Sequence, residues 1–267
     1  MPARVSVAGA GFDLLTHAEL IDSVAAAIRR DDGGTIVTPN IDICHRISKD
    51  ATSRGFLTSA SFVVPDGMPL LWASRLAGRP LVERITGSDL IYSLSRAAAA
   101  NGWPIYLIGG VQAGDGRLSA ATLAGDRLMS MYAGLEVAGT YAPAAGFNAM
   151  ADDIDVLCKE LAEAEPKIVF VGLGFPKQER LIARLIPHLP QAWFVGCGAA
   201  VPYAAGELRR APAWMQRSGL EWVFRLVSEP RRLAGRYLRR DLPFAVSLLV
   251  RSAWQGLRLR LRLDRVA

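Results

Sequence analysis

The stretch "KIVFVGLGFPKQERLIARL" (residues 167–185) decides the fold class. A β-branched apolar run ends at Gly172 and Gly174, and Pro176 then opens a segment whose apolar residues recur at helical spacing. Backbone N–H groups at such a helix start favour an anionic group, and Lys177 adds positive charge. We therefore expect nucleotide phosphate to bind at this turn. The alternative is a tight strand–helix corner that binds nothing.

The same strand–helix alternation extends along the chain. Alternation of this kind favours a mostly parallel sheet with helices on both faces. In such sheets, ligands bind at the carboxyl ends of the strands. The GxGxxG pattern of NAD and FAD sites does not occur, which argues against those cofactors. The predicted strands are "TIVT" (35–38), "SFVVP" (61–65), "IYLIGG" (105–110), "LEVAGTY" (135–141), "KIVFVGLG" (167–174) and "WFVGCG" (193–198). The predicted nucleotide-binding residues are Gly109, Gly110, Gly172, Gly174, Pro176, Lys177 and Glu179.

Composition and charge divide the chain into two parts. The 267 residues are 51% hydrophobic, enough for a large core, and the three cysteines form no disulfide framework, which favours a reducing cytoplasmic compartment. No apolar stretch of signal-peptide length opens the chain. Residues 1–205 have a net charge of −3, whereas residues 206–267 hold 14 arginines and have a net charge of +9. We expect an α/β domain over 1–205 and a basic appendage over 206–267, with two different roles.

Asp66, in "SFVVPDGMPLLW" (61–72), lies where a strand ends and a helix begins. A carboxylate there suits a helix N-cap, and it also suits a catalytic base. Thr38 and Asn40 end the preceding strand, and Arg84 and Asp89 follow the next helix. If the adjacent strands pair, these polar groups converge at one sheet edge. Such a cluster fits a reaction that needs one base and several donors around a sugar or a phosphate.

Five segments, taken in order, resemble the WecG/TagA/CpsF glycosyltransferases over roughly residues 5–240. They are "TPNID", "VVPDGMPLLWASRLAGRPLVERITGSDL", "YLIGG", "VGLGFPKQE" and "GELRRAPAWMQRSGLEWVFRLVSEPRRLAGRYLRR". The resemblance implies a Rossmann-like α/β fold with a membrane-associated C-terminal appendage. It also implies inverting transfer of a hexose, such as N-acetylmannosamine, its uronic acid or glucose, from a UDP donor. The implied acceptor is a saccharide on a polyprenyl diphosphate at the cytoplasmic face of the membrane.

The resemblance further assigns the catalytic base to Asp66. It assigns substrate contacts to Thr38, Asn40, Arg84 and Gln178. The one DxD pattern, "DID" (153–155), lies inside a helical pattern and is interpreted as part of the solvent-exposed acidic face of that helix. We therefore expect no metal site and no metal requirement. His45 is a less favoured candidate for the base. Pro202 stands where the family commonly has an aspartate, which leaves the donor sugar open.

The arginine-rich appendage mixes cations with aromatic and apolar residues. Its longest uncharged run, "LPFAVSLLV" (242–250), is too short to span a bilayer, so the appendage is expected to lie on an anionic membrane surface. The alternative is a helical cap that packs on the core and exposes its arginines to solvent. Nucleic acid is not expected as a partner, because the rest of the chain is acidic. The pattern "LRLRLRL" after Gly256 fits neither a clean helix nor a membrane span and stays unassigned, and self-association is left open. The alternative function is a non-catalytic nucleotide-binding module that docks on membrane or nucleic acid. Candidates for binding the acceptor diphosphate or the membrane are Arg210, Arg217, Arg225, Arg231 and Arg232.

Overall fold

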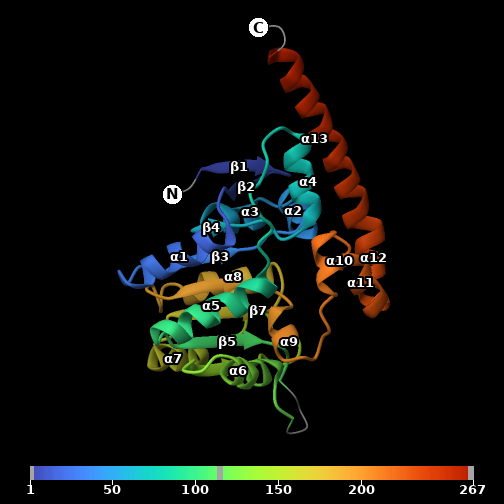
Figure 1. Ribbon diagram of the computed structural model, residues 1–267. Helices are drawn as coiled ribbons and strands as arrows, with labels where there is room; N and C mark the ends of the chain where they lie inside the picture. Colours follow the sequence, from blue (N-terminus) through green and yellow to red (C-terminus); the bar gives the residue numbers. More distant parts are fainter. Residues whose placement is uncertain (1–2, 113–116, 264–267) are drawn as a thin grey trace.

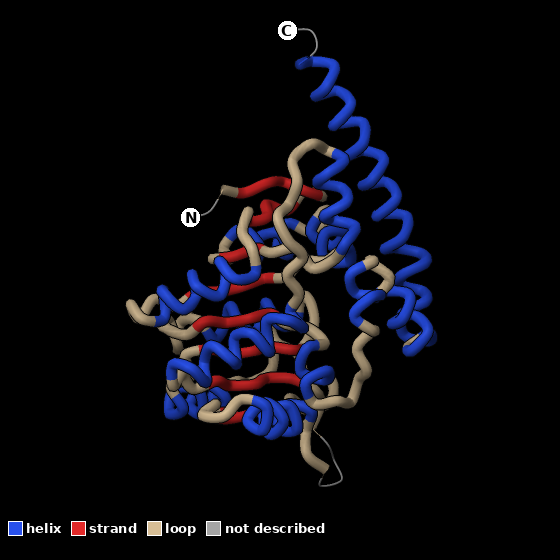
Figure 2. The backbone as a smooth tube through the Cα atoms, in the orientation of Figure 1, coloured by secondary structure: helices blue, strands red, loops and turns tan. Residues whose placement is uncertain are grey.

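The structure, a computed structural model, describes residues 3–112 and 117–263. Within them, six parallel strands form one sheet in the order β4-β3-β8-β7-β5-β6 (Figures 1 and 2). Each predicted strand is present, although β4 is only two residues long because Pro65 follows it closely. The strands are β3 (Gly34–Val37), β4 (Phe62–Val63), β5 (Ile105–Gly109), β6 (Val137–Tyr141), β7 (Ile168–Gly172) and β8 (Trp193–Gly196).

Helices cover both faces of the sheet, as predicted (Figure 1). Side chains alternate along a strand, so Ile168 and Phe170 pack with one set of helices, and Val169 and Val171 pack with the other. The first set is α1 (His17–Ile28), α5 (Gly87–Asn101), α6 (Ala120–Met131) and α9 (Ala200–Ala204). The second set is α7 (Asp155–Ala164) and α8 (Lys177–Leu185). A separate cluster beside β3 and β4 contains α2 (Ile41–Ile47), α3 (Ala51–Thr58) and α4 (Met68–Leu76).

An antiparallel hairpin that the sequence did not indicate lies beside the edge strand β4. It consists of β1 (Arg4–Val7) and β2 (Ala10–Asp13). Buried Asp13 joins the two parts, since its carboxylate accepts from Val63 N at 2.7 Å and from Arg4 Nε at 2.9 Å. Each strand has only four residues, and the alanines and glycines of the turn and of β2 interrupt the β-branched run that marks the central strands.

One predicted helix is shorter than expected, and one segment that the sequence left unassigned is helical. The helical pattern at 147–166 forms a helix only from Asp155 onward, so Asp153 precedes α7, where its carboxylate accepts from Asp155 N at 2.8 Å. The unassigned segment "LRLRLRL" is helical and forms the end of α13 (Leu242–Leu263). The helix continues through it because leucine and arginine are both strong helix formers.

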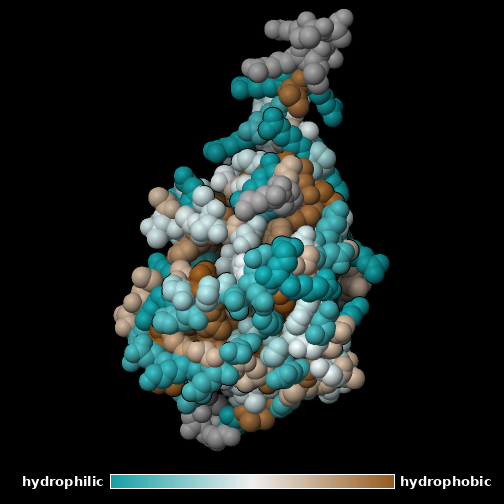
Figure 3. All heavy atoms as spheres, turned by 90° about the vertical axis from the view of Figure 1, so that its left-hand side faces the viewer, coloured by the Kyte–Doolittle hydropathy of each residue, from teal (hydrophilic) through white to brown (hydrophobic). Residues whose placement is uncertain are grey.

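The appendage packs along the cluster that contains α2 and α4. Its elements are α10 (Ala213–Arg217), α11 (Glu221–Ser228), α12 (Pro230–Arg236), a π-helical turn η1 (Tyr237–Asp241) and α13. Helix α13 lies against α4, where a Cβ at Gly256 would overlap the carbonyl oxygen of Leu76. The far end of α13 projects beyond the body (Figures 1 and 3). Among the described helices, none combines the length and the apolar character needed to cross a bilayer.

Buried Asp42 on α2 ties the appendage to the core. Its carboxylate lies 3.0 Å from Arg46 Nε, 3.0 Å from Arg240 Nη2 and 3.9 Å from Arg236 Nη1, and the last two arginines belong to the appendage. On the same helix, His45 stacks on Phe244 with 5.0 Å between ring centroids. One buried charge thus holds three cations, two of them from a segment almost 200 residues away in the chain.

Asp42→Asn is therefore expected to loosen the appendage. We expect the free energy of unfolding in urea to fall by about 1–3 kcal/mol, because charged hydrogen bonds at a buried carboxylate are lost. Trypsin should also cut the arginine-rich appendage faster. The matched control is Asp32→Asn, which removes an exposed pair with Arg30 and should change little. Equal effects of the two substitutions would show that Asp42 does not anchor the appendage.

Candidate active site at the carboxyl edge of the sheet

The pairing of β3 with β4 brings the predicted polar residues to one edge. Val64 N donates to Val37 O at 3.0 Å, and Asp66 N donates to Pro39 O at 2.9 Å, so the chain after β4 continues beside the chain after β3. Ile85 N then donates to Pro65 O at 3.0 Å, which returns the segment containing Arg84 to the same place. Backbone hydrogen bonds therefore bring together stretches of chain that are 20 to 27 residues apart.

Asp66 does not cap the helix that follows it. The N-cap of α4 is Gly67, whose φ of 147° suits glycine, and no side chain bonds to the exposed amides of that helix start. The helix-cap interpretation of the "PDG" sequence was therefore wrong. The carboxylate is instead available to the polar cluster around it.

The surroundings of Asp66 raise its pKa to about 7. The main cause is loss of solvation, because protein atoms surround the half-buried carboxylate and disfavour its charged form. The carboxylate of Glu221 raises the pKa further. Arg84 and Arg225 oppose the shift, and Asp89 adds a small increase. The result is a carboxyl group that changes its charge close to neutral pH, as a general base must.

An ionic network next to Asp66 joins the core to the appendage. Arg84 Nη1 lies 3.0 Å from Glu221 Oε2 on α11. Arg210 Nη1 lies 2.6 Å from Asp89 Oδ1, its Nη2 donates to Thr86 Oγ1 at 3.3 Å, and its Nε lies 3.7 Å from Glu221 Oε1. Burial alone would raise the pKa of Asp89, but the hydrogen bonds from Arg210 and Thr86 and the nearby arginine charges outweigh it and hold the pKa below its usual value. The network thus holds two guanidinium groups in fixed positions near the proposed base.

Arg225 is the third cation in the electrostatic environment of Asp66. Its guanidinium lies 5.9 Å from the centre of the Tyr203 ring, and its buried Nε has no hydrogen-bond partner among the described residues. An unsatisfied buried donor indicates a place where a ligand oxygen would be favourable. The other three predicted arginines differ: Arg217 and Arg231 are exposed, and Arg232 pairs with Glu229 at 2.6 Å.

Thr38 and Asn40 have structural partners at this edge. Buried Thr38 donates from Oγ1 to Gly196 O at 3.3 Å, which ties the end of β3 to the end of β8. Asn40 caps α2, its Oδ1 accepting from Ile43 N at 3.1 Å. Thr38 Oγ1 can still accept a hydrogen bond, and Asn40 retains its Nδ2 amide group as a donor. Their assignment as substrate contacts stays a prediction.

Gln178 and Glu179 form a buried pair at the start of α8. Gln178 Oε1 accepts from Gly174 N and Gly198 N, each at 3.0 Å, and so joins the turns after β7 and β8. Its Nε2 donates to Glu179 Oε1 at 2.9 Å. Burial raises the pKa of Glu179 to about 7, and its Oε2 has no partner among the described residues. Gln178, predicted to bind substrate, thus fixes the shape of two turns at the site.

The predicted glycines fall into two groups. Gly109 and Gly172 are paired across β5 and β7, and a Cβ on either would press against Val201 of α9. Their small size lets α9, which also contains Pro202, approach the sheet closely. Gly110 lies against Ala120 at the start of α6, with a φ of 75°. Gly174 instead lines an open cavity.

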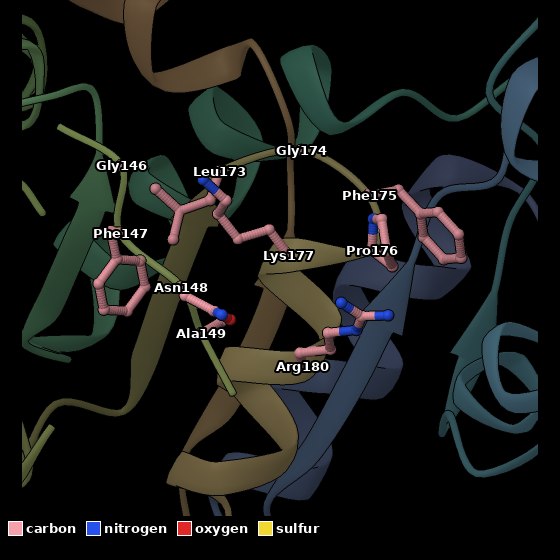
Figure 4. Close-up of a pocket in the computed structure, with 10 residues that line it drawn as sticks. All are labelled: Gly146, Phe147, Asn148, Ala149, Leu173, Gly174, Phe175, Pro176, Lys177 and Arg180. Carbon is pink, nitrogen blue, oxygen red and sulfur yellow. The ribbon is translucent and has the colours of Figure 1, made fainter. Parts of the chain in front are cut away.

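That cavity, of about 480 Å³, lies beside the turn between β7 and α8 (Figure 4). Lys177 lies between Phe147 and Asn148 on one side and Phe175 and Pro176 on the other, and Arg180 lies below it (Figure 4). Of the predicted nucleotide-binding residues, Gly174, Pro176 and Lys177 line the cavity, whereas Glu179 is buried and does not line it. The cavity and the network at Asp66 have no lining residue in common, although both lie at the carboxyl edge of the sheet.

Two residues of the site were not identified from the sequence. Glu221 is one acidic residue among many arginines, and its partner Arg84 is 137 positions away. Tyr203 is an ordinary aromatic residue in a short apolar helix. The excess of arginine over acid in the appendage was the available signal for Glu221, since a lone acid among cations tends to be paired.

Comparison with known proteins places the chain in a family. The model for the glycosyl transferase WecG/TagA/CpsF family matches residues 5–258. A Bacillus spizizenii protein named N-acetylglucosaminyldiphosphoundecaprenol N-acetyl-beta-D-mannosaminyltransferase is 32% identical over 203 residues, which cover 76% of this chain and 74% of the relative. A Staphylococcus aureus protein of the same name is 26% identical over 233 residues, covering 86% and 87% of the two chains. The chain therefore belongs to the WecG/TagA/CpsF family of glycosyltransferases.

Proposed function

We propose that this protein is an inverting glycosyltransferase that moves a hexose from a UDP-sugar to a saccharide on a polyprenyl diphosphate. The observation that carries the proposal is Asp66, a carboxyl group with a pKa of about 7 next to arginines from both the core and the appendage. One base surrounded by cations suits a reaction in which a hydroxyl loses a proton and a diphosphate leaves.

The proposed step is a single displacement at the anomeric carbon. The acceptor hydroxyl oxygen forms the new bond to that carbon as the bond to the UDP oxygen breaks. Asp66 takes the hydroxyl proton, and UDP leaves with the electron pair. Arg84, Arg210 and Arg225 supply positive charge for diphosphate groups, either on the donor or on the acceptor. Because arginines provide this charge, we propose that the reaction needs no metal ion.

The names of the relatives support the choice of substrates. Proteins similar over most of this chain are named for transfer of N-acetylmannosamine to N-acetylglucosaminyldiphosphoundecaprenol. We propose N-acetylmannosamine as the first donor sugar to test. Its uronic acid and glucose are the next donor sugars to test, because Pro202 occupies a position where the family commonly has an aspartate. The cavity at Gly174 and Lys177 is the proposed nucleotide site, since a cation and backbone amides at a helix start suit phosphate.

We further propose that α13 holds the protein at the cytoplasmic face of the membrane. An exposed apolar stripe runs along this helix with three- and four-residue spacing: Leu242, Val246, Val250, Trp254, Leu257 and Leu261. Arg251, Arg258 and Arg260 are exposed on the same helix. Apolar side chains beside arginines suit an anionic lipid surface. A lipid-linked acceptor would be found there.

Asp66→Asn is expected to abolish turnover. UDP release from UDP-N-acetylmannosamine should depend on a short-chain prenyl-diphosphate-N-acetylglucosamine acceptor, and it should continue in EDTA. The substitution should slow this release by about 10²–10⁴-fold, because the amide cannot accept the proton. Equal release by both proteins would place the base elsewhere. UDP-sugar binding without turnover by the unmodified protein would instead favour a non-catalytic binding module.

The pKa of Asp66 also predicts a pH dependence. Below about pH 7 the carboxyl group is protonated and cannot act as a base, so kcat/KM should fall about ten-fold per pH unit.

The raised pKa of Asp66 also affects stability, because the folded state binds more protons than the unfolded state between about pH 4 and pH 7. Asp66 therefore reduces stability as pH rises through that range. Asp66→Asn should therefore raise Tm at about pH 8 and leave it little changed near pH 4. In the kinetic profile, a fall in kcat/KM centred near pH 4 in place of pH 7 would contradict the assignment of Asp66.

The membrane proposal predicts binding to anionic vesicles. The protein should sediment with vesicles of anionic phospholipid, less with zwitterionic vesicles, and less again at high salt. Val250→Asp places a charge in the apolar stripe and should weaken binding. Val156→Asp is the matched control, since Val156 is exposed on α7 of the core. Loss of binding in both variants, or in neither, would exclude the stripe as the contact surface.

A further inference from the structure

Glu221 connects the appendage to the two arginines that we assign to diphosphate binding. It lies in the first turn of α11, and its two carboxylate oxygens face different partners. Oε2 lies 3.0 Å from Arg84 Nη1, and Oε1 lies 3.7 Å from Arg210 Nε. The side chains are well shielded, with 16% of Arg84 and 20% each of Arg210 and Glu221 exposed. The carboxylate therefore bridges two guanidinium groups in a poorly solvated place.

Glu221 Oε2 accepts a hydrogen bond from Arg84, whereas Arg210 Nε faces Oε1 and has no hydrogen-bond partner among the described residues. A phosphoryl group would offer oxygens to the same two guanidinium groups and would also satisfy that buried donor. We propose that Glu221 is a positioning residue that holds Arg84 and Arg210 in the unliganded site and competes with a substrate diphosphate for them. This inference rests on the proposed function, which gives those arginines a diphosphate to bind. It goes further in assigning an internal competitor that the diphosphate must displace.

The two arginines differ in what holds them once Glu221 leaves. Arg210 keeps Asp89 at 2.6 Å and Thr86 at 3.3 Å, so it stays in place. The ion pair of Arg84 is with Glu221, so displacement makes its Nη1 available to a phosphate oxygen. Displacement also has a mechanical consequence, since the contact that breaks joins the first turn of α11 to the core. Ligand binding and the docking of α11 are therefore opposed.

A simpler interpretation is that Glu221 only stabilises the start of α11, where an acidic side chain is favourable. The two interpretations differ in what the isosteric substitution Glu221→Gln does to anion binding. A structural role predicts unchanged or weaker binding. A competing role predicts tighter binding, because the neutral amide no longer holds the guanidinium groups against the incoming anion.

Calorimetric titration with inorganic pyrophosphate tests this directly. Glu221→Gln should bind pyrophosphate roughly five-fold or more tightly than the unmodified protein, as expected for loss of one competing ion pair. The control is Glu207→Gln, which removes the same charge from an exposed position of the appendage and should match the unmodified protein. Equal or weaker binding by Glu221→Gln would overturn the competition and leave diphosphate binding intact. Absence of binding in every protein would overturn both this inference and the proposed function.

A second measurement uses only the unmodified protein and so does not depend on how the variant folds. Hydrogen–deuterium exchange at backbone amides of residues 213–228 is compared with and without saturating pyrophosphate. If the anion displaces Glu221, exchange in α10 and α11 should become faster on binding. Slower or unchanged exchange would mean that the anion binds with the contact intact, which would overturn the inference.

Discussion

The site depends on one constraint: a carboxyl group held where it has lost much of its solvation. Asp66 follows a two-residue strand, and the hydrogen bond from its backbone to Pro39 fixes it beside the end of β3. Loss of water raises its pKa to about 7, and the nearby arginines limit that rise. A group so placed is costly for stability above neutral pH and useful for proton transfer at the same pH. The rest of the structure surrounds it with cations and keeps those cations in position.

Two separate attachments bring the appendage to this place. Asp42 gathers arginines from α12 and η1, and α13 packs along α4. These contacts position α11, from which Glu221 and Arg225 reach the surroundings of Asp66. Neither the sheet nor the appendage contains all the charges of the site. If the appendage also contacts the membrane through α13, then docking on lipid and completion of the site involve the same segment.

Much of the fold was predictable because the signals are local. β-branched runs that end in small residues gave the six central strands, and Asp66, Arg84 and Asp89 were expected at one edge from strand order alone. The β1–β2 hairpin was missed because its alanines and glycines carry little strand signal. Glu221 was missed because its contact with Arg84 is set by how the appendage docks, which no local pattern specifies. The buried pair of Gln178 and Glu179 shows the same limit, since its burial depends on how the turns after β7 and β8 meet the start of α8.

The central claim is that Asp66 titrates near neutral pH, and its carboxyl group can be observed directly. Protein labelled with ¹³C at the aspartate side-chain carboxyl carbons would be titrated by NMR. The Asp66 signal would be identified by its absence from the Asp66→Asn variant. We expect the Asp66 signal to titrate with a midpoint near pH 7, because the carboxyl group has lost much of its solvation. A midpoint near pH 4, the ordinary value for an aspartate, would show that the carboxylate is well solvated and that Asp66 does not titrate near neutral pH.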